Sequence, residues 1–250
     1  MLESLQGRLI FGRPTRIRPL VPGPHAGTYR VMAHRLERPG GVVLEGWSST
    51  PIDEPASQVM LYFGGRNENV VWAADMASFN RGLAVYAFNY RGFGASTGRA
   101  SERRAKRDAR AIHDFVAGRE SMTDVAIAGR SLGTALALWL AREVRPGRLV
   151  LMSPFENLPA VVRERRLGWA AAVTTQRFAC EELAAAYAGA TLLLMSETDT
   201  SIPHPHSLRL SARLPNAPRV QTIAGTTHRS LPRSQGAQAA IAAFLASAQA

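Results

Sequence analysis

The stretch AGRSLGTALAL, residues 128–138, puts a serine between two glycines where two dissimilar segments meet. The residues before the serine, DVAIAG at 124–129, are few and mostly apolar, as in a buried strand. The residues after it, LGTALALWLAREV at 132–144, are rich in alanine and leucine, which favour a helix. The pattern therefore predicts a strand, a tight turn with Ser131 at its apex, and a helix.

Outward from this turn, short apolar runs alternate with longer helix-like segments, which predicts a mostly parallel, eight-stranded twisted sheet flanked by helices. The first two strands are expected to be antiparallel. The expected strands lie at 28–37, 41–49, 58–63, 83–90, 124–129, 148–153, 190–196 and 219–225. The expected helices lie near 67–80, 101–118, 132–144, 205–213 and 233–248.

The length of 250 residues, with 46% hydrophobic residues, suits one α/β domain over 1–250 with an N-terminal extension at 1–27. The segment 154–189, between strands 6 and 7, is longer than a plain crossover helix requires. We expect a small helical, lid-like insertion there. The alternative is a long crossover with a bent helix.

The formal charge of +11 raises the question of an anionic partner. The basic residues are nearly all arginines spread along the chain, with Lys106 the only lysine. Their densest cluster, at 101–110, is interleaved with acidic residues and is typical of a solvated helix start capped by Ser101. We therefore expect no nucleic-acid partner, and a basic surface that binds an anionic partner stays as an alternative.

The chain also lacks the features of a membrane or exported protein. The uncharged run at 183–196 is too short to cross a bilayer of about 30 Å. The first residues do not have the pattern of a signal peptide, and the lone Cys180 cannot form an intrachain disulfide. We expect a cytoplasmic protein with no membrane span, and the sequence sets no oligomeric state.

Ser131 is a candidate nucleophile. A serine hydroxyl attacks at neutral pH only when a base takes its proton and donors receive the resulting oxyanion. Gly129 and Gly133 lack the Cβ atoms that would clash in so sharp a turn, and the helix start directs the Leu132 N–H at the developing charge. The competing interpretation is a serine that merely caps the helix.

A second oxyanion donor is expected in the loop after an earlier strand. In QVMLYFGGRNENV, residues 58–70, Gly64 and Gly65 allow the backbone to approach the site, and the Arg66 N–H follows them. The alternative is a simple glycine turn into the next helix.

The base is expected late in the chain, on a loop after a strand. His228, in GTTHRS, fits that position, with a surface-loop histidine as the alternative. His204 and His206 begin the predicted helix near 205–213 and receive no chemical role. The other three histidines precede the serine: His25, His34 and His113.

The acid that orients the base is expected to be Asp199, just beyond the strand at 190–196. Glu197 is the rival, two positions closer to the strand. Asp199 is preferred because Ile202 and Pro203 immediately after it form a tight turn that holds the loop. A metal site of Asp199, His204 and His206 lacks a further ligand cluster, so we expect no metal and no organic cofactor.

Three motifs together resemble the α/β-hydrolase superfamily: YFGGRNENV at 62–70, NYRGFGASTGRASE at 89–102, and AGRSLGTALA at 128–137. The resemblance runs from about residue 30 to the carboxyl end, and within the superfamily it points to the compact, small-lidded depalmitoylase-like and serine-aminopeptidase-like hydrolases. It implies a Ser131–Asp199–His228 triad, with the N–H groups of Arg66 and Leu132 as the oxyanion hole. It also implies that the following residues shape the active-site loops: Gly64, Gly65, Tyr90, Arg91, Gly92, Gly94, Ser96, Gly129 and Gly133.

The chain departs from this family pattern at two places. It has Gly64–Gly65 where many relatives carry His-Gly, which removes a side chain that buttresses the oxyanion loop. It has Ala100 before Ser101 where relatives often have a proline.

The expected function is a serine hydrolase that cleaves a small-molecule carboxylic ester, thioester or amide through an acyl-enzyme. Apolar residues of the insertion are candidates for an acyl pocket or for packing on the sheet: Phe155, Leu158, Val161, Val162, Leu167 and Trp169. Arg163, Arg165 and Arg166 suit an anionic leaving group or a solvated face. A non-catalytic binding module of the same fold is the alternative from another class.

Overall fold

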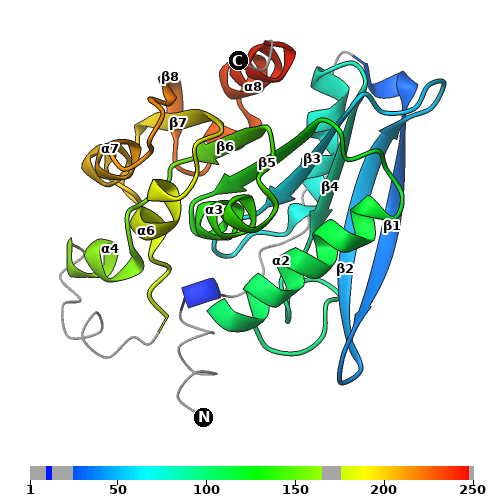
Figure 1. Ribbon diagram of the computed structural model, residues 1–250, viewed down its shortest axis with the longest axis horizontal. Helices are drawn as coiled ribbons and strands as arrows, with labels where there is room; N and C mark the ends of the chain where they lie inside the picture. The colour runs from blue at the N-terminus through cyan, green and yellow to red at the C-terminus, as the bar shows by residue number, and fades with distance from the viewer. Residues whose placement is uncertain (1–9, 13–24, 165–175, 248–250) are drawn as a thin grey trace.

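The computed structural model of the protein describes residues 10–12, 25–164 and 176–247 (Figure 1). The described strands form one eight-stranded sheet in the order β1-β2-β4-β3-β5-β6-β7-β8. β1 with β2 and β2 with β4 are antiparallel pairs, and the remaining pairs are parallel. The strands are β1 (Tyr29–Arg38), β2 (Val42–Pro51), β3 (Gln58–Phe63), β4 (Leu83–Phe88), β5 (Val125–Arg130), β6 (Arg148–Met152), β7 (Ala190–Thr198) and β8 (Arg219–Thr227).

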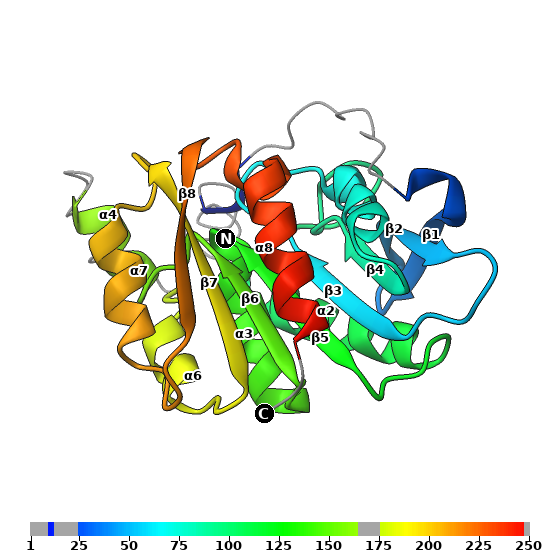
Figure 2. The same cartoon turned by 90° about the horizontal axis from the view of Figure 1, so that it is seen from above.

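Helices cover both faces of this sheet (Figure 2). η2 and α8 pack on one face, while α2, α3 and α6 pack on the other. The helical elements are η1 (Ala26–Thr28), η2 (Val70–Phe79), α2 (Glu102–Ala117), α3 (Leu132–Val144), α4 (Leu158–Glu164), α6 (Cys180–Ala185), α7 (His204–Ser211), η3 (Leu231–Arg233) and α8 (Gln235–Ala246).

The central strands are buried on both faces, which explains why they are continuous apolar runs in the sequence. Neighbouring residues of β6 illustrate this. Val150 points into the core cluster under η2 and α8, and Leu151 points into the cluster under α2 and α3. Both side chains are completely buried.

The predicted eight-stranded, predominantly parallel sheet is confirmed. β3 and α3 have the predicted bounds, and Ser101 caps α2 by accepting a hydrogen bond from the Arg104 amide. The helix predicted near 67–80 is instead a 3-10 helix that begins at Val70. The residues before it belong to a loop, because Asn69 caps the helix and the Glu68 carboxylate binds the Gly65 amide.

The segment 154–189, expected to be an insertion, contains α4 and α6, on the α3 side of β7 in Figure 1. Two of its residues, Phe155 and Val161, are buried in the core cluster under α2 and α3. The lid expectation rests in part on residues 165–175, among them Arg165, Arg166, Leu167 and Trp169, which lie outside the described residues. Within the described chain, every helix falls short of the length and apolar character that a membrane span requires.

Candidate active site

Ser131 lies on a strained turn between β5 and α3. Its backbone has φ 49° and ψ −118°, a conformation that non-glycine residues rarely adopt and that is found mostly at functional sites. The turn requires glycine on either side, because a Cβ on Gly129 would clash with the Gly133 backbone. A Cβ on Gly133 would overlap the Phe63 carbonyl. The two glycines therefore have the steric role that the sequence indicated.

Backbone hydrogen bonds hold this turn in place. The Ser131 N–H donates to the Met152 carbonyl at 2.8 Å, and Thr134 donates to the Ser131 carbonyl through both its N–H and its hydroxyl. Ser131 occupies the N-cap position of α3 but makes no side-chain capping bond, whereas Ser101 caps α2 in the ordinary way. A simple capping role for Ser131 is therefore excluded.

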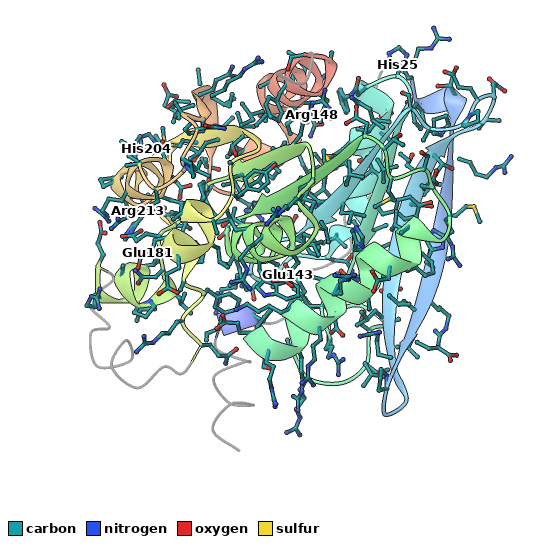
Figure 3. The ribbon with its side chains drawn as sticks, in the orientation of Figure 1. His25, Glu143, Arg148, Glu181, His204 and Arg213 are labelled. Atoms are coloured by element: carbon teal, nitrogen blue, oxygen red, sulfur yellow. The ribbon has the colours of Figure 1, made fainter. Side chains whose placement is uncertain are left out.

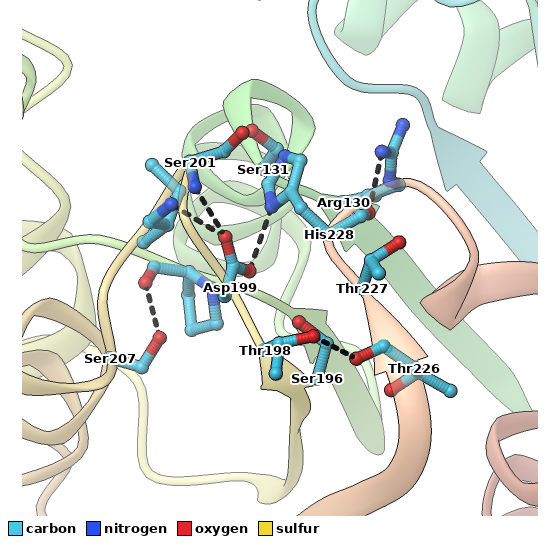
Figure 4. Close-up of polar contacts among 12 residues, drawn as sticks. Arg130, Ser131, Ser196, Thr198, Asp199, Ser201, Ser207, Thr226, Thr227 and His228 are labelled. Atoms are coloured by element: carbon cyan, nitrogen blue, oxygen red, sulfur yellow. Dashed lines mark hydrogen bonds and ion pairs between the residues drawn. The ribbon is translucent and has the colours of Figure 1, made fainter.

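His228 and Asp199 form a direct pair at the carboxyl ends of β8 and β7 (Figure 4). His228 Nδ1 lies 2.8 Å from Asp199 Oδ2. The other carboxylate oxygen of Asp199 accepts from the Ser201 amide at 2.9 Å and the Ile202 amide at 2.7 Å. The side chain of Asp199 is 1% exposed and that of His228 is 16% exposed, so the acid is enclosed and the base is open to a reactant.

Asp199 stays ionised despite its burial. Burial alone would raise the pKa of its carboxyl, but the His228 hydrogen bond and charge and the Ile202 amide together lower the pKa to about 2. Ser153 is also close enough to lower the pKa of Asp199, although its buried hydroxyl makes no hydrogen bond of acceptable geometry. An ionised carboxylate only accepts, so His228 Nδ1 carries a proton and donates it to the Asp199 carboxylate.

Ser131 and His228 belong to neighbouring loops that are tied together. Arg130 Nη2 donates to the His228 carbonyl at 2.8 Å, which fixes the base beside the nucleophile turn (Figure 4). Among the described residues, no hydrogen bond joins Ser131 Oγ to His228 Nε2. Contacts of this kind are often long in unliganded enzymes and tighten when substrate binds.

The predicted oxyanion loop follows β3. Leu132 is the first residue of α3, so its N–H has no partner within the helix. The Gly65 N–H is taken by the Glu68 carboxylate at 2.6 Å, and the Tyr90 hydroxyl donates to the Gly64 carbonyl at 2.6 Å. The next amide along this loop is that of Arg66, the one singled out from the sequence.

The motif at 89–102 forms a turn that is held by contacts to α2 and to nearby backbone groups. Gly92 and Gly94 have φ 80° and 53°, values that glycine tolerates best. Arg91 points at α2, where it makes a two-pronged ion pair with Asp108 at 2.7 and 2.8 Å. Ser96 Oγ donates to a backbone carbonyl and accepts a backbone amide, which braces the turn.

The other candidate residues have structural partners. Glu197 accepts a hydrogen bond from the Gly225 amide at 2.9 Å, and His204 Nε2 lies 2.7 Å from the Ser196 carbonyl. His206 is buried against Glu156. Burial raises the pKa of the Cys180 thiol. Within the described residues, no group of three or more His, Cys, Asp or Glu side chains is placed to hold a metal ion.

Sequence reasoning missed Glu68 and Arg130, which form a buried ion pair of 2.7 Å beside Ser131. Both residues lie within motifs that the sequence singled out, but a sequence does not reveal that two charged side chains 62 positions apart are buried together. The only available signal was Arg130, a charged residue directly at the end of a strand.

Comparisons with known proteins agree with this architecture. A family model described as serine aminopeptidase, S33, matches residues 54–178. An uncharacterised protein of Mycobacterium tuberculosis is 30% identical over 199 residues, which cover 77% of this chain and 70% of that protein.

Two further proteins are similar to this chain, one over a short stretch of sequence and the other over most of the fold. The lysophosphatidylserine lipase ABHD12 of Macaca fascicularis is 42% identical over 82 residues, 31% of this chain and 21% of the lipase. The esterase Pf2001 of Pyrococcus furiosus shares the fold with a TM-score of 0.69 at 18% identity, over 93% of this chain and 98% of the esterase. Family model, relatives and fold agree, and the chain belongs to the serine aminopeptidase S33 family of α/β hydrolases.

Proposed function

We propose that this protein is a serine hydrolase that cleaves a carboxylic ester, thioester or amide through an acyl-enzyme on Ser131. The observation that carries the proposal is the 2.8 Å hydrogen bond between His228 and the ionised, enclosed Asp199, at the same edge of the sheet as the strained Ser131 turn. Family membership supports hydrolysis, and the arrangement of Ser131, His228 and Asp199 supports their proposed roles as nucleophile, base and acid.

In the proposed reaction, His228 Nε2 takes the proton of the Ser131 hydroxyl as its oxygen attacks the substrate carbonyl. The Leu132 and Arg66 N–H groups stabilise the negative oxygen that forms. The protonated imidazole, which Asp199 stabilises, then gives its proton to the leaving alcohol, thiol or amine. Water activated by His228 cleaves the acyl-serine and restores the free enzyme.

The test of the nucleophile is covalent labelling by a fluorophosphonate probe. Wild type should be labelled at Ser131, and Ser131→Ala should lose labelling together with about 10⁶-fold of kcat. Ser101→Ala is the matched control, because Ser101 is also a buried N-cap serine but caps its helix. Undiminished labelling of Ser131→Ala, or an unlabelled wild type, would contradict the proposal and favour a binding module.

The leaving-group class is resolved by a substrate panel run on wild type and Ser131→Ala. The panel contains p-nitrophenyl esters of increasing acyl length, an acyl thioester, an aminoacyl anilide and lysophosphatidylserine. The anilide represents the family description and the lysophospholipid represents the activity named for one relative. We expect Ser131-dependent turnover of at least one acyl class, and a wild type inactive on all four would count against the proposal.

A further inference from the structure

Glu68 is a buried carboxylate that organises the loop after β3. It is 7% exposed and accepts four hydrogen bonds. Its donors are the Gly65 amide at 2.6 Å, the Arg130 guanidinium at 2.7 Å, and the Tyr62 hydroxyl and Trp72 indole at 2.9 Å each. A carboxylate offers about four lone-pair sites, so its acceptor capacity is filled.

Arg130 connects this carboxylate to the base. One arm of its guanidinium, Nη1, binds Glu68, and the other, Nη2, donates to the His228 carbonyl at 2.8 Å. The residue is 8% exposed and directly precedes Ser131. Because β3 and β5 are parallel neighbours with Phe63 opposite Gly129, the loop after β3 adjoins the nucleophile turn.

The pair is charged in the folded protein. Burial would raise the pKa of Glu68, but the positive charge of Arg130 and the Gly65 amide lower it. Buried ion pairs of this kind often add little stability compared with apolar residues of similar volume, because both charges lose their hydration. Fold stability alone therefore does not account for a buried pair at this place.

We propose that Glu68 and Arg130 are positioning residues that hold the oxyanion loop and the His228 loop in fixed register with Ser131. This inference rests on the proposed function. Glu68 fixes the Gly65 amide, one peptide before the Arg66 N–H that receives the oxyanion. Arg130 fixes the backbone of His228, and the shared ion pair makes the two placements interdependent. In this chain, Glu68 gives the oxyanion loop a side-chain support that Gly64 and Gly65 do not supply.

The experiment measures kcat and KM for Arg130→Met, Arg130→Lys, Glu68→Gln and the double variant Glu68→Gln/Arg130→Met on the best ester of the panel. Misplacement of catalytic groups by about 1 Å costs about 10²-fold, so we expect Arg130→Met to lower kcat by about 10²-fold with KM within about threefold. Lysine keeps the charge but lacks the two-armed geometry, so Arg130→Lys should recover only part of kcat. The double variant should be less impaired than the product of the single effects.

Arg148 provides the matched control at the opposite end of the sheet. It is also a buried arginine on a strand, with one arm on Asp124 and the other on the Ser247 carbonyl beyond α8. Figure 3 labels Arg148 near α8. Arg148→Met removes the same kind of pair away from the catalytic groups. It should lower the melting temperature yet leave kcat close to wild type.

The outcomes separate the two proposals. Loss of activity in Ser131→Ala together with wild-type kcat in Arg130→Met or Arg130→Lys would overturn the positioning role and leave the proposed function intact. Equal losses of kcat in Arg130→Met and Arg148→Met would also overturn it, because they would indicate a general effect of destabilisation. If Arg130→Met does not fold, Arg130→Lys decides, and full wild-type kcat in that variant contradicts the inference.

Discussion

At the scale of single residues, the site depends on charges that burial alone would neutralise. Asp199 is enclosed, yet its pKa is about 2 in the folded protein, against an ordinary value of 3.8. The native state therefore binds fewer protons than the unfolded chain as the pH falls through this range. The stability that Asp199 supplies is complete above about pH 4 and is lost between 3.8 and 2.

This linkage predicts how Asp199→Asn changes with pH. The variant should unfold more easily than wild type at pH 7, and the difference in unfolding free energy should shrink as the pH falls from about 4 towards 2, because asparagine does not titrate. Urea unfolding at pH 7, 4 and 3 measures this difference, with the exposed Asp53→Asn as control. A difference that stays constant over the whole range would contradict the prediction.

The residues of the site were predictable to different degrees. Ser131 and Asp199 each follow a mostly buried strand, and His228 follows the exposed edge strand β8. The carboxyl ends of parallel strands meet at one edge of the sheet, so the approximate placement of all three residues follows from the sequence. Glu68 and Arg130 could not be paired in that way. Their contact depends on the register of β3 against β5, which only the assembled sheet defines.

At the scale of elements, buried strands and long helices were predicted most accurately. β3 and α3 match their expected bounds because each is uniform in composition and ends at glycines or charged residues. The 3-10 geometry of η2 was not predicted, since its apolar sequence suits an α-helix equally well. The contact of residues 10–12 with the active-site loops was not foreseen either, because it is made by three residues of a segment treated as an extension.

Phe11 tests what this N-terminal contact contributes. Its ring is 1% exposed and packs edge-on against Tyr90 at 5.2 Å and Phe178 at 6.0 Å, while its carbonyl accepts the Asn67 amide at 2.9 Å. Phe11→Ala should cost about 3–5 kcal/mol of unfolding free energy. It should also lower kcat. The ring anchors the Phe11 backbone, whose carbonyl binds the Asn67 amide, and Asn67 directly follows the proposed oxyanion donor Arg66.

The control for Phe11→Ala is Phe244→Ala, a buried aromatic residue of α8 on the opposite face of the sheet. Both variants should show a lower melting temperature by differential scanning fluorimetry. Only Phe11→Ala should show a reduced kcat at a temperature where both proteins remain folded. Equal kcat values in the two variants would restrict Phe11 to a packing role.

At the scale of the whole molecule, several of the arginines in this chain of net charge +11 are paired with carboxylates inside the structure. Arg38 and Arg91 both bind Asp108, and Arg130 and Arg148 form the buried pairs described above. Such arginines are held by neighbouring carboxylates and are not presented as a continuous basic surface.

The sheet itself couples the two halves of the core. Val150 and Leu151 are adjacent on β6 and belong to opposite core clusters, so neither cluster can be lost without disturbing a strand that the other one shares. Unfolding should therefore be cooperative across both faces of the sheet, although the chain exceeds the usual size of a two-state domain.

Leu151→Ala tests this coupling, because it creates a cavity on the α3 face only. The substitution should cost about 2–5 kcal/mol. The most protected amides of α3 on the near face and α8 on the far face should lose protection by the same free energy in native-state hydrogen exchange, since both open with the shared sheet. Retention of wild-type protection in α8 would contradict the prediction, because it would mean that the two faces of the sheet unfold as separate units.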